Sequence, residues 1–314
     1  MARFIIHRLI SLIPVLVGIA LLAFFAIRLV PGDAVLTILG QEATPELVAE
    51  VRRIMGLDQP LYMQLIDWLA HLARLDFGKS FTSGRPILPD ILLRLPATLE
   101  LTLAATLVSI TLAIPLGMLT AMKRGSVWDY VERMISLAGL SIPSFWLALL
   151  LIEMFALRLD ILPAVGYVPF TEDPIGNLRG LILPALSLGV GMVAVVARYT
   201  RSSMLDVLGQ DYIRTARGKG LRERRLIIRH ALKNALIPVV TVTGIQMGRL
   251  IGGTVIVEEI FAWPGLGRFT LQAIFERDYP VVQTMVMVIA FFFVIINLLV
   301  DILYCYLDPR IRFD

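Results

Sequence analysis

The sequence predicts an all-α membrane protein with six transmembrane helices, and three observations support this fold class. Hydrophobic residues make up 57% of the 314 positions, a share above that of ordinary soluble domains. These residues gather in six stretches that can cross, or nearly cross, about 30 Å of hydrocarbon as helices. Lys and Arg collect in alternate connections between the stretches, the distribution that marks the cytoplasmic side of a membrane.

The predicted spans are residues 9–27, 101–122, 135–157, 181–197, 235–257 and 281–303. The first resembles a secretory signal, but its apolar run exceeds a signal core and residues 30–33 offer no small-residue cleavage site. We therefore expect a retained anchor. An even number of spans puts both termini on one side of the membrane. The basic residues near both termini, around 123–133 and in 198–238 indicate that this side is cytoplasmic.

Four regions follow from this arrangement. Residues 1–30 form a tail and the first span, and residues 31–96 form an extracytoplasmic insertion between spans one and two. Residues 97–307 form a five-helix core that contains the basic loop 198–238. Residues 308–314 form a cytoplasmic C-terminal tail.

Two short helices are predicted in the insertion. Thr44 suits the N-cap of the first helix, Pro45 suits its first turn and Gly56 suits its end. Pro60 suits the start of the second helix, in which an apolar stripe consists of Leu61, Leu65, Trp68, Leu69 and Leu72. Neither helix can bury much apolar surface alone, so we expect both to lie on the outer ends of the spans.

The loop 198–238 is a basic, hydrophilic segment between two apolar stretches, with ten Lys or Arg against three acids. Gly209 can end the preceding helix, and Asp211 suits the start of a new one. Tyr212, Ile213 and Ala216 would give this helix a small apolar face, and Gly220 fits its left-handed stop. A helix under three turns long is marginal in water, so we expect another surface to hold it. The net charge of the whole chain is a modest +4, and the excess of positive charge is concentrated in this loop, which favours membrane orientation over nucleic-acid binding.

The sequence Thr215-Ala216-Arg217-Gly218-Lys219-Gly220 resembles the Glu-Ala-Ala loop of bacterial ABC importer permeases of the peptide/nickel type. Gly218 replaces a more usual Ala, and Pro238 lies further from Gly220 than in the general importer pattern. The resemblance implies that this helix couples the permease to a groove in a separate ATPase subunit. The implied coupling residues are Asp211, Tyr212, Ile213, Arg214, Thr215, Ala216, Arg217 and Gly220. The alternative is a basic loop that only sets membrane orientation.

The resemblance extends along most of the chain, in the same order. Similar phrases occur at residues 77–80, 141–146, 162–167, 263–268, 277–280 and 307–312. The family implies a bacterial inner-membrane complex with a second permease subunit that forms a heterodimer with this chain, two ABC ATPase subunits and an extracytoplasmic substrate-binding protein. ATP and Mg would be used by the ATPase subunits, so this chain is expected to bind no cofactor. Closure of the ATPases would pull the coupling helix and tilt the spans toward inward access.

Polar residues inside the predicted spans need a reason, because a charge in lipid costs at least about 2.5–3.5 kcal/mol. Gln246 and Arg249 lie three apart in span five and are candidates for the translocation path. Glu153 and Asp301 suit a structural ion pair or a position near the membrane surface. Span five also carries a stripe of small residues suited to close helix packing, within the chain or against the second permease, at Gly244, Gly248 and Gly252.

Other function classes find little support in the sequence. Gly78-Lys79-Ser80 resembles the end of a phosphate-binding loop, but Ala73 stands where that loop requires glycine. The three histidines are scattered, and a single cysteine, Cys305, predicts neither a disulfide nor a cysteine metal cluster. We therefore expect an importer permease for di- or oligopeptides or a related solute. A permease for nickel or a metal chelate is the alternative, and a membrane-embedded enzyme or a scaffold would be the other class.

Overall fold

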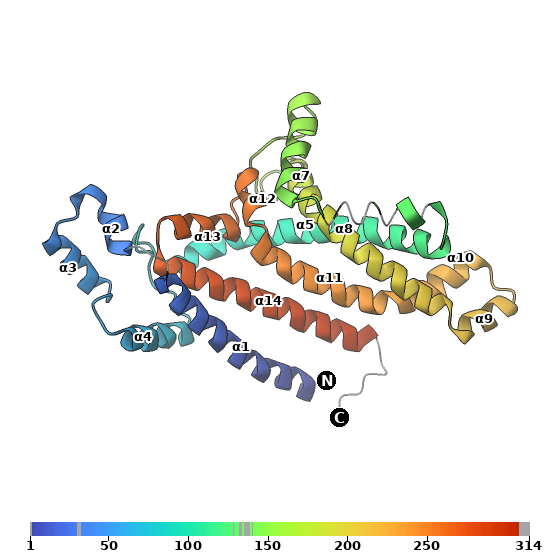
Figure 1. Cartoon of the computed structure of the whole chain (residues 1–314), viewed down its shortest axis with the longest axis horizontal. Coiled ribbons are helices and arrows are strands. Elements are labelled where there is room, and N and C mark those ends of the chain that lie inside the picture. Colours follow the sequence, from blue (N-terminus) through green and yellow to red (C-terminus); the bar gives the residue numbers. More distant parts are fainter. Residues whose placement is uncertain are drawn as a thin grey trace. The chain divides into compact units, whose positions relative to one another are not determined.

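The computed structural model describes residues 2–29, 33–127, 129–131, 134, 139 and 141–307. Figure 1 shows that this part of the chain is built from helices, and its β-structure is limited to one isolated antiparallel bridge between Lys79 and Pro86. The chain divides into two compact units. Unit 1 comprises residues 1–98 and 264–294, and unit 2 comprises residues 99–263 and 295–314. The prediction of an all-helical protein is confirmed for the described residues.

Five helical segments of the described chain are long and apolar enough to cross a membrane. They lie in α1 (Ala2–Leu29), α5 (Ile87–Met122), α8 (Pro174–Leu208), the run Glu223–Gly253 that ends in α11 (Lys233–Gly253), and α14 (Tyr279–Leu307). The helices α5 and α8 begin well before the predicted spans, because the prediction followed the apolar stretch and missed the polar first turns.

The predicted third span, 135–157, lies partly outside the described residues. Its described portion contains α7 (Ser144–Leu151) and a π-helical continuation, η2 (Ile152–Arg158), which together are shorter than a membrane crossing. The C-terminal tail 308–314 also lies outside the described residues.

The insertion in unit 1 is helical, as predicted. Its helices are α2 (Ala34–Leu39), the 3-10 turn η1 (Gly40–Glu42), α3 (Pro45–Ile54) and α4 (Leu61–Ala73). Thr44 Oγ1 accepts the Leu47 N–H at 3.3 Å, with Pro45 in the first turn. Gly56 follows α3 with φ +66°, a conformation that favours glycine.

Unit 1 is closed by the buried carboxylate of Asp278, which follows α13 (Leu266–Phe275). This carboxylate accepts the Ser80 hydroxyl at 2.5 Å and the backbone N–H groups of Phe81 and Thr82 at 3.1 and 3.3 Å. The turn that follows Gly78 therefore has a structural role in the described chain. It connects the insertion to the segment that begins α14.

In unit 2, α8 packs against α7 and α11. Small residues on the helices allow close contact. A Cβ on Gly117 of α5 would lie 2.5 Å from the carbonyl oxygen of Ala197 in α8, and one on Gly189 of α8 would lie 2.8 Å from Val108 of α5. Such backbone approach increases van der Waals contact between helices in a membrane. A short helix, α12 (Val255–Ile260), also packs against α7 and α8.

Candidate functional site

The basic loop contains the short helix α9 (Asp211–Gly218), close to the predicted helix. It follows the end of α8, and Gly220 ends it with φ +77°. Figure 1 shows α9 and α10 (Glu223–Arg225) at the same end of unit 2 as the end of α8. A π-helical stretch, η3 (Leu226–Leu232), joins α10 to α11. Helical segments of this kind are frequent at functional sites.

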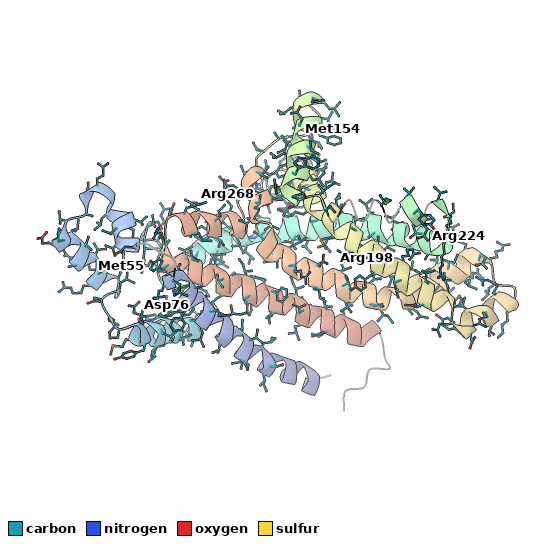
Figure 2. The ribbon with its side chains drawn as sticks, in the orientation of Figure 1. Met55, Asp76, Met154, Arg198, Arg224 and Arg268 are labelled. Carbon is teal, nitrogen blue, oxygen red and sulfur yellow. The ribbon has the colours of Figure 1, made fainter. Side chains whose placement is uncertain are left out.

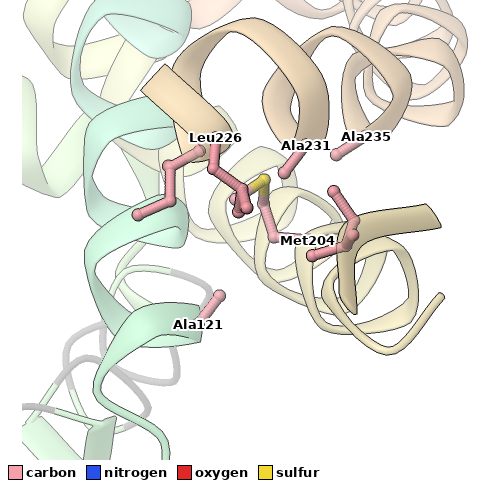
Figure 3. Close-up of a cluster of buried hydrophobic side chains, with 7 residues drawn as sticks. Ala121, Met204, Leu226, Ala231 and Ala235 are labelled. Atoms are coloured by element: carbon pink, nitrogen blue, oxygen red, sulfur yellow. The ribbon is translucent and has the colours of Figure 1, made fainter. Parts of the chain in front are cut away.

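One side of α9 is anchored in a hydrophobic cluster. The Ile213 side chain is fully buried, and Ala216 packs partly buried against the same group. Figure 3 shows the cluster, whose members come from α5, α8, α9, η3 and α11: Ala121, Met204, Ile213, Leu226, Ile227, Ala231 and Ala235. This chain therefore supplies a surface that holds the short helix.

Two polar contacts hold the flanks of α9. The Tyr212 hydroxyl accepts a hydrogen bond from Asn234 Nδ2 of α11 at 2.8 Å. Arg217 Nε donates to Glu223 Oε1 at 2.6 Å across the turn at Gly220. The hydrogen bond and the charge of Glu223 raise the pKa of Arg217 above its ordinary value, so the guanidinium stays charged.

The predicted apolar face of α9 is therefore corrected in one respect. Ile213 and Ala216 point into the cluster, but Tyr212 lies on the flank and is 44% exposed. Successive helical residues point in directions about 100° apart, so Tyr212 lies at the edge of the side that Ile213 buries. Sequence spacing alone did not show that Ile213 is buried and that its neighbour Tyr212 is exposed.

The outward side of α9 consists of exposed residues, namely Asp211, Arg214, Thr215 and Gly218. Arg214 Nη2 lies 3.3 Å from the Asp211 carboxylate, one turn away on the same side. A Cβ added to Gly218 would meet nothing within 4 Å. This side thus presents an ion pair, the Thr215 hydroxyl and a glycine. The helix that carries them is held by the buried side chain of Ile213 and by the polar contacts of Tyr212 and Arg217.

Sequence reasoning missed a buried ion pair in unit 2. Asp129 is buried, and its carboxylate accepts Arg201 Nε and Nη2 at 2.8 and 3.0 Å and the Gly125 N–H at 3.0 Å. The contact fixes the loop after α5 to α8, one helical turn before the cluster residue Met204. The available signal was an acid in a connection that the prediction treated as basic. The prediction counted Arg201 only as one more positive charge.

The two candidate path residues do share one side of α11. Arg249 Nη1 donates to Gln246 Oε1 at 3.3 Å, with Arg249 exposed and Gln246 half-buried. Glu153 accepts Arg158 Nε at 2.9 Å, so it forms the kind of ion pair that was expected. Asp301 is half-buried on α14.

The glycine stripe of α11 divides between the chain's interior and its surface. A side chain on Gly244 would overlap Val300 of α14, so its small size serves packing within this chain. Gly248 is also buried by this chain, whereas Gly252 is exposed. Of the two alternatives for the stripe, Gly244 therefore fits packing within the chain, because Val300 covers it.

In the described part of the chain, no group of three or more His, Cys, Asp or Glu side chains is arranged to hold a metal ion.

Comparison with known proteins supplies independent information. Residues 113–313 match the family described as binding-protein-dependent transport system inner membrane component, and residues 1–102 match the N-terminal component of the same kind of system. A putative peptide transport system permease protein of Brucella abortus is 46% identical over 314 residues, covering 100% of both chains. The dipeptide transport system permease protein DppB of Alkalihalophilus pseudofirmus is 43% identical, again covering 100% of both chains.

A third relative and a solved structure agree with these matches. The glutathione transport system permease protein GsiC of Salmonella choleraesuis is 41% identical over 313 residues, covering 100% of both chains. The fold resembles a chain of the MetNI methionine ABC transporter in an inward-facing crystal form, with a TM-score of 0.57 and 18% identity. That match covers 69% of this chain and 96% of the other, so it supports a shared fold.

Proposed function

The chain belongs to the family of binding-protein-dependent transport system inner membrane components, and on that premise we propose that it conducts peptides across the bacterial inner membrane. It is a permease of an ABC importer. The full-length relatives named for peptide, dipeptide and glutathione transport support a peptide cargo, at 41–46% identity. A second permease, two ATPase subunits and a substrate-binding protein would complete the importer.

The observation that supports the mechanism is the attachment of α9 to the rest of this chain. Its inner side is buried in the cluster around Ile213, and hydrogen bonds of Tyr212 and Arg217 hold its flanks. A helix fixed in this way moves with α8 and α11 instead of swinging freely. We assign the exposed side of Asp211, Arg214, Thr215 and Gly218 to the ATPase groove, as a revision of the larger set predicted from sequence.

Force applied to this exposed side would reach two candidate spans directly. Met204 of α8 and Ala235 of α11 belong to the same cluster as Ile213, and Asn234 of α11 bonds Tyr212. Closure of the ATPases would therefore displace the cytoplasmic ends of both helices together. Arg249 and Gln246, further along α11, would change their access as that helix tilts.

The topology that we propose has six spans with both termini in the cytoplasm. The third span would comprise residues 135–157, with α7 and η2 as its outer portion. The basic residues of loop 198–238 support a cytoplasmic position for α9. The insertion 31–96 would then lie outside the cytoplasm.

A matched charge reversal tests the coupling assignment. Arg214→Glu changes a charge on the outward side of α9, whereas Arg224→Glu makes the same change on α10, where Figure 2 labels Arg224 in the same loop. In the reconstituted importer, we expect Arg214→Glu to reduce copurification of the ATPase subunits and peptide uptake, with Arg224→Glu near wild type. A loop that only sets orientation would respond equally to both changes.

Cargo is tested separately with the same importer. A labelled dipeptide should be taken up in an ATP-dependent manner, and free nickel should neither compete nor be transported. Arg249→Gln should leave assembly intact but lower uptake, because the guanidinium would meet the carboxylate of the peptide in the pathway. Nickel uptake without dipeptide uptake would refute the peptide assignment.

A further inference from the structure

The helix α4 has more apolar surface than unit 1 covers. Large apolar side chains along it are exposed, including Tyr62 and Ile66, each at 63%. A lone exposed apolar residue is ordinary, but a helix side built from several of them indicates a partner. The uncovered side consists of Tyr62, Met63, Ile66, Ala70 and Ala73.

The opposite side of α4 rests on the end of α1. The Trp68 and Phe24 rings lie 6.0 Å apart, and Figure 1 shows α4 beside that end of α1. Arg28 Nη2 also donates to Gln64 Oε1 at 2.8 Å. These contacts fix α4 beside Phe24 and Arg28, in the C-terminal turns of the candidate membrane span in α1. When α1 crosses a membrane, its C-terminal turns are expected near the boundary between hydrocarbon and water, and α4 lies beside those turns.

The polar residues of α4 share a separate side. Gln64, Asp67 and His71 line one hollow together with Arg28 and Lys79. His71 Nδ1 lies 3.7 Å from the Asp67 carboxylate. The helix thus has a covered apolar side, a polar side and an uncovered apolar side. This three-way division suits a helix lying in the plane of a membrane interface.

The neighbouring surface of α1 identifies the occupant of the uncovered side. Phe25 and Leu29 follow directly after Phe24 and Arg28, the residues that contact α4, and both are exposed. On a membrane span such residues face lipid. We propose that α4 is an interfacial helix whose uncovered side, around Tyr62 and Ile66, lies against lipid acyl chains in continuity with α1. With the topology proposed above, the lipid belongs to the outer leaflet.

Spin labels on α4 of the whole importer, reconstituted in vesicles, test the proposal. In a Cys305→Ser background, Ile66→Cys and Ala70→Cys place labels on the uncovered side, and Asp67→Cys places a matched label on the polar side of the same helix. We expect labels at 66 and 70 to collide with dissolved oxygen and to lose collision with a water-soluble nickel chelate. The label at 67 should show the reverse.

Two results would overturn the proposal. Collision with the nickel chelate at 66 and 70, equal to that at 67, would place the uncovered side in water. Protection of 66 and 70 from both oxygen and the chelate would mean that a protein covers it. Repeating the measurement with and without the substrate-binding protein identifies that protein as the cover if protection appears only when it is present.

Discussion

Replacing Ile213 by alanine should uncouple ATP hydrolysis from transport without unfolding the permease. The side chain is fully buried, and truncating such a residue costs about 2–5 kcal/mol. The hydrogen bond between Tyr212 and Asn234 contributes only about 0.5–1.5 kcal/mol, and the exposed ion pair between Arg217 and Glu223 contributes less. Ile213 is therefore the main anchor of α9.

The loss should act locally, because α9 has eight residues and is too short to be stable without its support. A cost of about 3 kcal/mol lowers the ratio of anchored to detached α9 by roughly 100-fold. Only molecules with an anchored α9 are expected to bind the ATPase subunits. When most molecules have a detached α9, the apparent affinity for the ATPase subunits falls in proportion to the fraction of molecules in which α9 is anchored. The variant should insert normally and bind the ATPases weakly.

The assay measures the ATPase subunits that copurify with the permease, and peptide-stimulated ATP hydrolysis in vesicles. Ile213→Val is the matched control, since it removes one methylene and costs about 0.5–1.5 kcal/mol. It should fall between wild type and Ile213→Ala. Wild-type ATPase binding and coupled transport in Ile213→Ala would refute the view that the cluster holds the coupling helix.

Three further predictions concern other contacts. Tyr212→Phe and Asn234→Ala should each weaken ATPase copurification by up to about tenfold, and the double variant should be no worse than either alone, because they remove the same hydrogen bond. Gly218→Ala should stabilise α9 by about 0.5–1 kcal/mol and preserve ATPase binding; weaker binding would mean that the groove requires glycine there. Burial raises the pKa of Asp33, but hydrogen bonds from Arg52 and the Val35 N–H outweigh this effect and hold the pKa below its ordinary value. The ionised Asp33 carboxylate therefore stabilises the folded insertion, and resistance to proteolysis measures this stability. The stabilisation should be fully present above the unfolded-state pKa and should be lost as the pH falls through the lower folded-state pKa. Asp33→Asn should lack this pH-dependent loss.

The features that the sequence predicted correctly are those set by neighbouring residues. The cap at Thr44, the start of α9 at Asp211 and its end at Gly220 depend on residues a few positions apart. Hydropathy likewise located the long apolar helices, although it missed the polar first turns of α5 and α8. In each case the deciding interaction lies within one or two helical turns.

The features that were missed depend on distant residues. Asp129 pairs with Arg201 across 72 positions, and Gly244 meets Val300 of another helix. Helical periodicity shows which residues share a side of α9 but not which side meets the rest of the protein. That choice was made by the cluster around Met204, whose members come from five separate segments.

The contact between Ser80 and Asp278 has a consequence for biosynthesis. These residues are 198 positions apart, so a ribosome adding about 5–20 residues per second makes the donor roughly 10–40 s before its acceptor. Throughout that interval the hydroxyl of Ser80 and the backbone N–H groups of Phe81 and Thr82 lack the carboxylate that accepts their hydrogen bonds in the folded protein. Unit 1 closes only when the last long helix begins to emerge. Nascent chains that stop before Asp278 are therefore the form in which membrane proteases can reach the insertion most readily.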